Sequence, residues 1–203
     1  MPAAPTNFTF PPEPEVQPIT LRCATPSDAA ALALVGAATF LEAYAWVLPG
    51  ADILAFCTQH STPEAYTKYL ALPSTRITLA LTGDEVPIGF AMVCACDLEG
   101  FATQPGDTEL KRLYLFSRYR AQSSPVLNAA GQPIPGLSGG QALLNAAIAN
   151  ARGLGAHRLL LGTNAGNQRA IAFYRRNGFQ EIGTRTFVVG NQCCCDLLFA
   201  LPL

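Results

Sequence analysis

Apolar positions in the first quarter of the chain recur with a helical period. An alternating segment at Ile19–Cys23 predicts a short strand. Thr25 can then cap a helix, and Asp28 can return the hydrogen bond as in a capping box. The pattern carries this helix to about Tyr44. Its expected buried positions include Leu32, Val35 and Leu41.

Two further helices are predicted before the first β-rich region. Pro49 and Gly50 interrupt the chain, and a short helix over Ala51–Cys57 follows. Residues 61–64, Ser-Thr-Pro-Glu, repeat the helix-start signal. The pattern continues this third helix to about Leu72.

The rest of the chain mixes strand and helix patterns. Helices are predicted from Ser138 to about Gly153 and over Asn167–Asn177, with Gly178 in the left-handed conformation after the last turn. This alternation indicates an α/β (α+β) fold with a mixed sheet and helices on both faces. We expect a single domain at 19–203 behind a Pro-rich tail at 1–18. The expected strands are Arg76–Thr82, Val86–Asp97, Thr108–Phe116, Arg158–Leu161, Phe179–Val189 and Gln192–Leu201.

Composition and charge narrow the class of protein. Half of the residues are hydrophobic, the formal net charge is −1, and no apolar run reaches the length of a membrane-spanning helix. This balance favours neither a nucleic-acid groove nor an anionic membrane surface. The N-terminus lacks a basic start followed by an apolar stretch, which is typical of a protein that stays in the cytoplasm.

Seven cysteines raise the question of disulfides or metal. An odd number without a secretory signal favours reduced thiols. The run Cys193–Cys195 could bind a metal ion, but side chains on a strand point to alternating faces, and neither His60 nor His157 is near in sequence. We favour the interpretation that these cysteines belong to a strand packed against the core, and no metal is expected.

One candidate for chemistry is a strand, a turn and a helix start. The strand ends near Phe116, a basic segment follows at 118–122, and Ser138-Gly139-Gly140-Gln141 opens a helix. Free N–H groups and the helix dipole can cradle a phosphate there. A kinase-type P-loop and a dinucleotide fingerprint are both excluded by the residues and their order. An ordinary strand–loop–helix connection explains this region equally well when it is taken alone.

The second candidate is the segment 167–179. Its spacing Asn-x-x-Ala-x-x-x-Tyr, followed by Gly-Phe, resembles the acetyl-CoA-binding helix of the GNAT N-acetyltransferase superfamily. Leu110–Leu115 with Gly139-Gly140 resembles the pyrophosphate motif of that superfamily. Both motifs stand in the family's order, and the resemblance extends over about residues 19–201.

The resemblance implies a fold and a donor site. The sheet would have about seven mostly antiparallel strands, with the fourth and fifth strands splayed and acetyl-CoA in the gap. Backbone groups of Leu113 and Leu115 would hold the acetyl carbonyl and pantetheine. The full set of implied cofactor-binding residues is Leu113, Tyr114, Leu115, Arg120, Gln122, Gly139, Gly140, Gln141, Asn167, Ala170 and Tyr174.

The resemblance also implies two catalytic roles. Tyr174 occupies the position of the acid that protonates the departing thiolate, which a phenol with pKa near 10 can do. Glu109 begins the strand facing the cofactor, where the family often has a carboxylate that can act as base. An ordinary charge at a strand end is the alternative for Glu109.

The acceptor would enter from the side of the first helices. Glu42 and Tyr44, with Trp46, could line that side and receive a primary amine of a small molecule or peptide. Tyr44 and Trp46 can instead be packing residues, because aromatics at helical spacing usually belong to a core. The final strands and the apolar composition permit a homodimer.

The match departs from the family at residues 123–137. They separate the basic segment from the glycines, and Ser138 replaces the expected first glycine. Either the extra residues bulge outward and leave the cradle intact, or the cradle is damaged. The second case leaves two alternatives to an enzyme: a non-catalytic domain that senses acyl-CoA, and an interaction protein that binds no CoA.

Overall fold

The computed structural model describes residues 17–98, 101–120, 124–189 and 192–203. Within these ranges, seven strands form one sheet in the order β1-β2-β3-β4-β5-β7-β6, and β4 and β5 are its parallel pair. The predicted fold class is therefore confirmed. The strands are β1 Thr20–Cys23, β2 Arg76–Leu81, β3 Pro87–Ala95, β4 Asp107–Leu115, β5 Arg158–Asn164, β6 Gln180–Val189 and β7 Gln192–Pro202.

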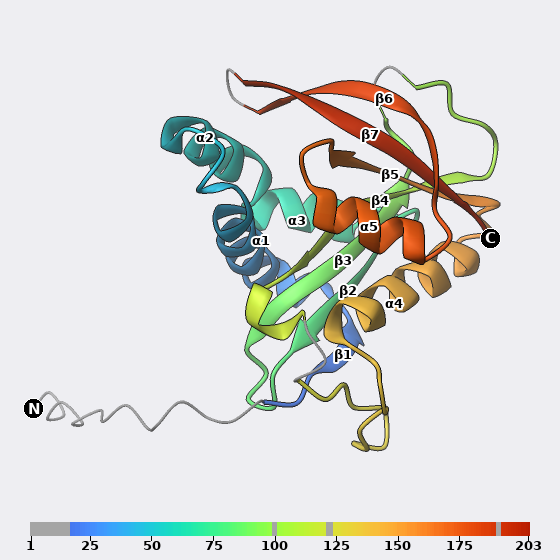
Figure 1. Ribbon diagram of the computed structural model, residues 1–203. Coiled ribbons are helices and arrows are strands. Elements are labelled where there is room, and N and C mark those ends of the chain that lie inside the picture. Colours follow the sequence, from blue (N-terminus) through green and yellow to red (C-terminus); the bar gives the residue numbers. More distant parts are fainter. Residues whose placement is uncertain (1–16, 99–100, 121–123, 190–191) are drawn as a thin grey trace, which may run out of the picture.

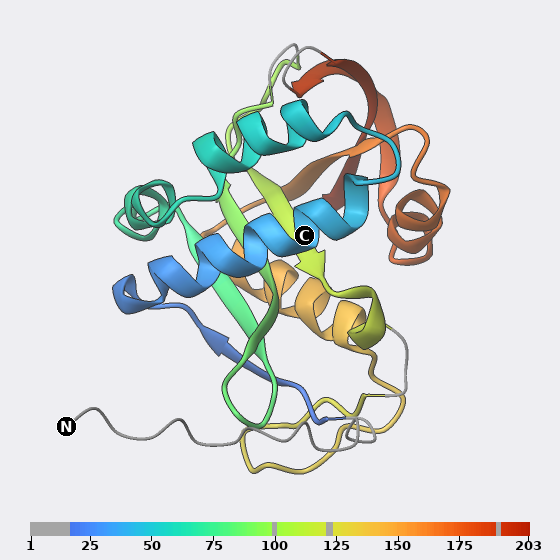
Figure 2. The ribbon, with the colours of Figure 1, turned by 90° about the vertical axis from the view of Figure 1, so that its left-hand side faces the viewer.

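Helices cover both faces of this sheet (Figure 1). Figure 2 shows α1 crossing one face, with α2 and α3 beside it and α4 behind the sheet. Within the described residues, no helix is both long and apolar enough to cross a membrane. The helices are α1 Ala29–Tyr44, α2 Gly50–His60, α3 Pro63–Leu70, α4 Gly139–Gly153 and α5 Gln168–Arg176, with short 3-10 helices at Pro26–Asp28 and Ser117–Tyr119.

The predicted helix starts are present. The backbone N–H of Thr25 donates to the Asp28 carboxylate at 2.7 Å, and Arg22 binds the same carboxylate. At α3, the Thr62 hydroxyl accepts a hydrogen bond from Ala65 N at 3.2 Å. Each signal lies within one turn of chain, so local sequence alone determines it.

The phase of α1 corrects one predicted core position. Leu32 and Val35 are buried, but Leu41 is 53% exposed. Nine residues separate Leu41 from Leu32, which at 100° per residue places the two side chains on opposite sides of the helix. Thr39 and Phe40 take the buried positions of the last turns instead.

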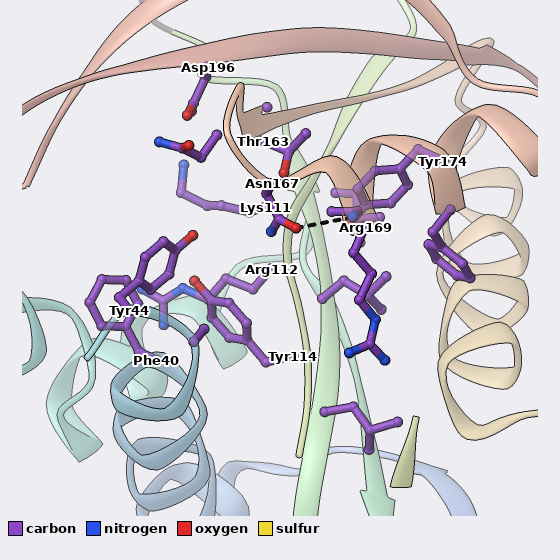
Figure 3. Close-up of a pocket in the computed structure, with 18 of the residues that line it drawn as sticks. Phe40, Tyr44, Lys111, Arg112, Tyr114, Thr163, Asn167, Arg169, Tyr174 and Asp196 are labelled. Carbon is purple, nitrogen blue, oxygen red and sulfur yellow. Dashed lines mark hydrogen bonds between the residues drawn. The ribbon is translucent and has the colours of Figure 1, made fainter. Parts of the chain in front are cut away.

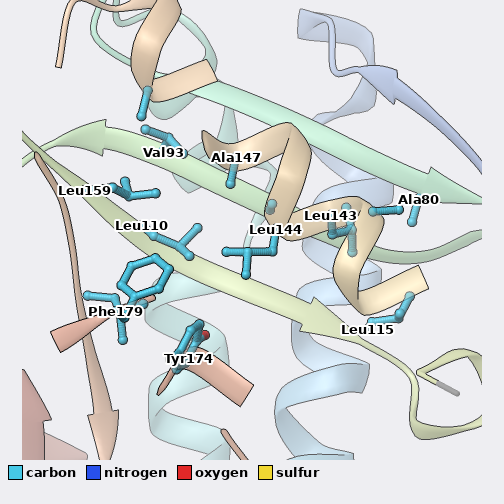
Figure 4. Close-up of a cluster of buried hydrophobic side chains, with 14 of the residues drawn as sticks. Ala80, Val93, Leu110, Leu115, Leu143, Leu144, Ala147, Leu159, Tyr174 and Phe179 are labelled. Carbon is cyan, nitrogen blue, oxygen red and sulfur yellow. The ribbon is translucent and has the colours of Figure 1, made fainter. Parts of the chain in front are cut away.

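A separate hydrophobic cluster fills each face of the sheet. On one face, Leu143, Leu144 and Ala147 of α4 pack over Leu110 and its neighbours (Figure 4). On the other face, the cluster joins buried residues of α1 and α3 to β2 and β3. The two clusters hold β4 between the layers, so the side chains of β4 reach both sides of the sheet.

Residues 124–137 pack beside the start of β1. The backbone of Ile19 donates to Pro125 O and accepts from Leu127 N, both at 2.8 Å, and Val126 is buried beneath it. A turn at Asn128–Gln132 then reverses the chain, which returns to α4. The extra residues thus extend outward, while Gly139 still begins the helix.

Candidate active site

The parallel strands β4 and β5 separate after a short pairing. Three registered pairs join them, the last between Glu109 and Leu160, and the strands then diverge. Phe116 N donates to Ile88 O on β3. Because donors alternate along a strand, the N–H groups of Leu113 and Leu115 point to the opposite edge, toward the gap. The predicted splay of the fourth and fifth strands is confirmed.

A bulge in β4 determines which of its side chains share a face. Met92 pairs with Arg112 and Val93 pairs with Leu110, so Lys111 is an extra residue without a partner on β3. Leu110 packs on the α4 side, and so do the residues at 113 and 115. Glu109 therefore lies on the same face as Arg112 and Tyr114, because the bulge shifts the alternation by one.

The gap opens into a cavity of about 920 Å³. Its walls come from α1, α2, β4, α5 and the β6–β7 hairpin, and the N-terminus of α4 closes one end. Figure 3 shows aromatic residues of α1 and β4 on one side and Tyr174 on the other. A space of this size can take a cofactor and a small acceptor together.

Tyr174 lies on α5 at the wall of the cavity and is 8% exposed. Its ring packs edge-on against Phe173 and Phe179, with centroids 5.5 Å away in both cases. Burial raises the pKa of the Tyr174 phenol, and the neighbouring Tyr44 adds to the increase. The phenol therefore keeps its proton at neutral pH and can act as a donor.

Glu109 is a buried carboxylate that lines the same cavity. It accepts hydrogen bonds from Lys111 Nζ and from Asp97 N, both at 3.3 Å. Burial alone would lower the pKa of Lys111, but Glu109 reverses the direction and holds it above its ordinary value. The alternative of an exposed strand-end charge does not fit this burial, and the role of Glu109 as base stays a prediction.

The N-terminus of α4 contains two glycines with different surroundings. A Cβ on Gly139 would lie 2.7 Å from Tyr119 O, so packing alone requires this glycine. A Cβ on Gly140 would meet no atom within 4 Å, and Gly140 lines the cavity. Its missing side chain leaves open the space in front of the helix start, which fits a phosphate group.

Gln141 is engaged by the protein itself. Its backbone N–H donates to the Ser138 hydroxyl at 3.3 Å, and its amide donates to Asn145 and Asn177 at 2.9 and 2.7 Å. The side chain thus ties α4 to α5 at the edge of the cavity. Gln122, also predicted to contact the cofactor, lies outside the described residues.

Arg120 bridges the end of β4 and α1. Its Nε donates to Leu115 O at 2.6 Å, and its Nη2 lies 3.1 Å from the Glu42 carboxylate. Glu42 also accepts from the backbone and hydroxyl of Ser117. Glu42 is not among the residues that line the cavity. Its predicted contact with an acceptor stays a prediction, and the contact observed is with Arg120.

Asn167 caps α5 with its side-chain oxygen, which accepts from Ala170 N at 3.1 Å (Figure 3). Both residues line the cavity. Because the side-chain oxygen of Asn167 is used in the cap, its side-chain NH2 group is the part that can donate to a ligand.

The two aromatic residues near the end of α1 have different environments. Tyr44 lines the cavity, and burial raises the pKa of its phenol. Trp46 is 81% exposed, and its indole N–H donates to Ala43 O. The packing interpretation is thus wrong for Trp46, which lies just beyond the last helical turn.

Sequence reasoning missed several charged residues of the cavity. Arg169 and Arg176 of α5 line it, and within the described part of the chain Arg169 has no acidic partner. Arg185 and Asp196 line it on the side of the β6–β7 hairpin. Arg169 lies within the Asn-x-x-Ala-x-x-x-Tyr motif, directly before Ala170. Its position in the sequence was therefore a signal from which its place in the cavity could have been predicted.

The arrangement of sheet, gap and cavity defines an acyl-CoA-dependent acetyltransferase, and comparisons with known proteins agree. A model of the acetyltransferase (GNAT) family matches residues 136–179. The uncharacterized N-acetyltransferase Rv2669 of Mycobacterium tuberculosis is 32% identical over 164 residues, which is 81% of this chain and 90% of that protein. The chain belongs to the GNAT family of acetyltransferases.

Solved structures share the fold at low sequence identity. The PaiA N-acetyltransferase of Thermoplasma acidophilum, in complex with coenzyme A, aligns with a TM-score of 0.68 and 19% identity over 91% of this chain and 99% of its own. A GCN5-related N-acetyltransferase of Rhodopseudomonas palustris aligns with a TM-score of 0.64 and 18% identity over 93% and 98%.

Proposed function

We propose that this protein transfers the acetyl group of acetyl-CoA to a primary amine of a small molecule or peptide. The amine attacks directly while donor and acceptor are bound together. The observation that carries the proposal is the gap between β4 and β5, which opens beyond Glu109 beside the Tyr174 ring. YncA of Salmonella typhimurium, which shares the fold at 18% identity over 91% of this chain and 94% of its own (TM-score 0.58), was solved with its cofactor acetyl-CoA.

Residues along the gap suit the parts of this donor. The N–H groups of Leu113 and Leu115 face the gap and can bind an acyl carbonyl or an amide. Gly140 and the start of α4 offer donors to a pyrophosphate, and Arg169 adds a positive charge. The Asn167 amide can donate from the far wall. The donor supplies the activated thioester, and these groups orient it.

Two side chains handle the protons in this proposal. An alkyl ammonium has a pKa near 10, so the acceptor must lose a proton before it attacks. Glu109 takes that proton, directly or through water. Tyr174, which is protonated at neutral pH, donates a proton or a hydrogen bond to the departing thiolate. Both groups line one continuous cavity.

Calorimetry with CoA and acetyl-CoA, followed by an assay of free CoA against a panel of amines, tests the proposal. We expect saturable binding of both ligands and amine-dependent release of CoA. Binding without release by any amine would contradict catalysis and support an acyl-CoA sensor. Absence of binding would contradict the proposal entirely and favour an interaction protein.

A further inference from the structure

The far end of the cavity contains a second buried carboxylate. The Asp196 side chain is 8% exposed, and its Oδ2 lies 3.3 and 3.4 Å from Nη2 and Nε of Arg185. Among the described residues, Oδ1 of Asp196 has no hydrogen-bond partner, and the residue lines the cavity. Half of this carboxylate is thus available to a ligand.

A glycine on β5 makes room for this ion pair. A Cβ on Gly162 would lie 3.0 Å from Arg185 Nη2 and 3.2 Å from Asp196 Oδ2. Asp196 and Arg185 are also cross-strand partners in the β6–β7 register. Strand pairing and the missing side chain together fix the carboxylate against the sheet, as a preformed binding group requires.

Aromatic and apolar side chains line the same cavity as Asp196. The rings of Phe40 and Phe56 stack with centroids 4.2 Å apart, and both line the cavity. Val188 and Val189 line it from β6. In Figure 3, the carboxylate of Asp196 and the hydroxyl of Tyr44 both point into this space.

Asp196 differs from Glu109 in how far its charge is compensated. Glu109 is held by Lys111 and by the backbone of Asp97, which leaves it little need for a further cation. Burial raises the pKa of Asp196, and Arg185 opposes this only in part. A buried carboxylate with one long ion pair gains from a second cation, because desolvation has already occurred.

We propose that Asp196 binds the ammonium group of the acceptor, and that the acceptor class is alkyl-ammonium compounds carrying an aromatic or bulky apolar group. The apolar part contacts the ring pair of Phe40 and Phe56. The inference rests on the proposed function only in calling this ligand the acceptor. Asp196 acts in binding, and the proton that the amine must lose before it attacks goes to Glu109 through water, because Glu109 is level with Leu160 of β5 and Asp196 is level with Asn164, four residues further along.

Three ligands of one shape and different charge test the assignment. Phenethylamine is a cation at neutral pH, 2-phenylethanol is neutral and 3-phenylpropanoate is an anion. Calorimetry at saturating CoA gives their dissociation constants for the wild type, Asp196→Asn and Asp97→Asn. Asp97 is the matched control, because it lines the same cavity, loses the same charge and contacts Glu109 only through its backbone N–H.

We expect the wild type to prefer phenethylamine. Asp196→Asn should weaken phenethylamine binding roughly tenfold to a hundredfold and leave 2-phenylethanol unchanged. Asp97→Asn should leave both unchanged. An equal loss of amine and alcohol would overturn the assignment, as would the same selective loss in Asp97→Asn. Tightest binding of 3-phenylpropanoate would do so too, because it would assign the site to carboxylates facing Arg185.

A second variant distinguishes loss of the binding group from misfolding caused by an uncompensated Arg185. Asp196→Asn leaves Arg185 without its carboxylate, whereas Arg185→Gln with Asp196→Asn removes both charges and should show the same selective loss. Undetectable phenethylamine binding by the wild type at millimolar concentration also counts against the inference. These readouts need no turnover, so an inactive protein with Asp196-dependent amine binding would contradict the transferase alone.

Discussion

Asp107 and Arg158 form a bidentate ion pair at the closed end of the gap between β4 and β5. Arg158 donates from Nε and Nη2 to the two carboxylate oxygens at 2.8 and 2.7 Å, and the residues are also the first registered pair of these strands. The Asp107 side chain is 1% exposed. The gap therefore opens from a point that charge and backbone pairing fix together.

Loss of this pair should destabilise the fold in a pH-dependent way. Hydrogen bonds from Arg158 lower the pKa of Asp107 below its unfolded value, so its stabilisation is present above about pH 4 and lost as the pH falls. Asp107→Asn should lower the free energy of unfolding by about 1–3 kcal/mol at pH 7. Urea titrations at pH 7 and pH 3 measure the effect, which should shrink at the lower pH.

Glu181→Gln is the control for that experiment. Glu181 pairs with Arg175 at 2.8 Å, but both side chains are largely exposed. An exposed pair contributes about 0–1 kcal/mol, so this variant should stay close to the wild type. Equal effects of the two substitutions would mean that the buried pair has no special part in holding β4 to β5.

Removal of the Tyr174 hydroxyl should separate turnover from binding. The ring is held by Phe173 and Phe179, so Tyr174→Phe should keep the packing. We expect turnover to fall by roughly two orders of magnitude, with the dissociation constant of acetyl-CoA nearly unchanged. Steady-state kinetics and calorimetry on the same preparation measure both. Unaltered turnover would remove the assignment of the phenol as acid.

The two glycines of α4 should respond to alanine in opposite ways. Gly139→Ala brings a Cβ within 2.7 Å of the Tyr119 carbonyl oxygen and should cost about 1–3 kcal/mol of stability. Gly140→Ala meets no protein atom, so stability should hold while CoA binding weakens roughly tenfold from crowding of the phosphate. Thermal melts and CoA titrations measure the contrast. Normal CoA affinity in Gly140→Ala would place the pyrophosphate elsewhere.

Arg169 should contribute electrostatically to the binding of the phosphates. Arg169→Gln should weaken CoA binding roughly tenfold at low salt, with a smaller effect at high salt. Pantetheine, which lacks the phosphates, should bind both proteins alike. The control is Arg152→Gln on the exposed end of α4. A loss of pantetheine affinity in Arg169→Gln would indicate a structural role instead.

The range over which residues interact explains what sequence could predict. The caps at Thr25 and Thr62 and the left-handed Gly178 depend on neighbours within a few positions, and all three are present. The bulge at Lys111 can be read from the sequence. The spacing between leucines changes from three residues, Leu110 to Leu113, to two residues, Leu113 to Leu115. That change of phase was a readable signal for the face that Glu109 occupies.

The acceptor end of the cavity left no comparable trace. Asp196 reaches its environment through pairing with Arg185 on β6, through the absence of a side chain at Gly162, and through rings contributed by α1 and α2. These contacts join segments that lie far apart in the chain. An aspartate in an otherwise apolar strand gives no information on its own about which residues will face it.

The outward course of residues 124–137 has a practical consequence. The segment is fastened at its base to Ile19, and its tip at Asn128–Gln132 is a tight reversal whose polar backbone groups are satisfied locally. A tag or reporter peptide spliced into that tip would leave both the helix start and the anchored base in place. The tip therefore offers a handle for immobilising or labelling this enzyme while substrates are screened.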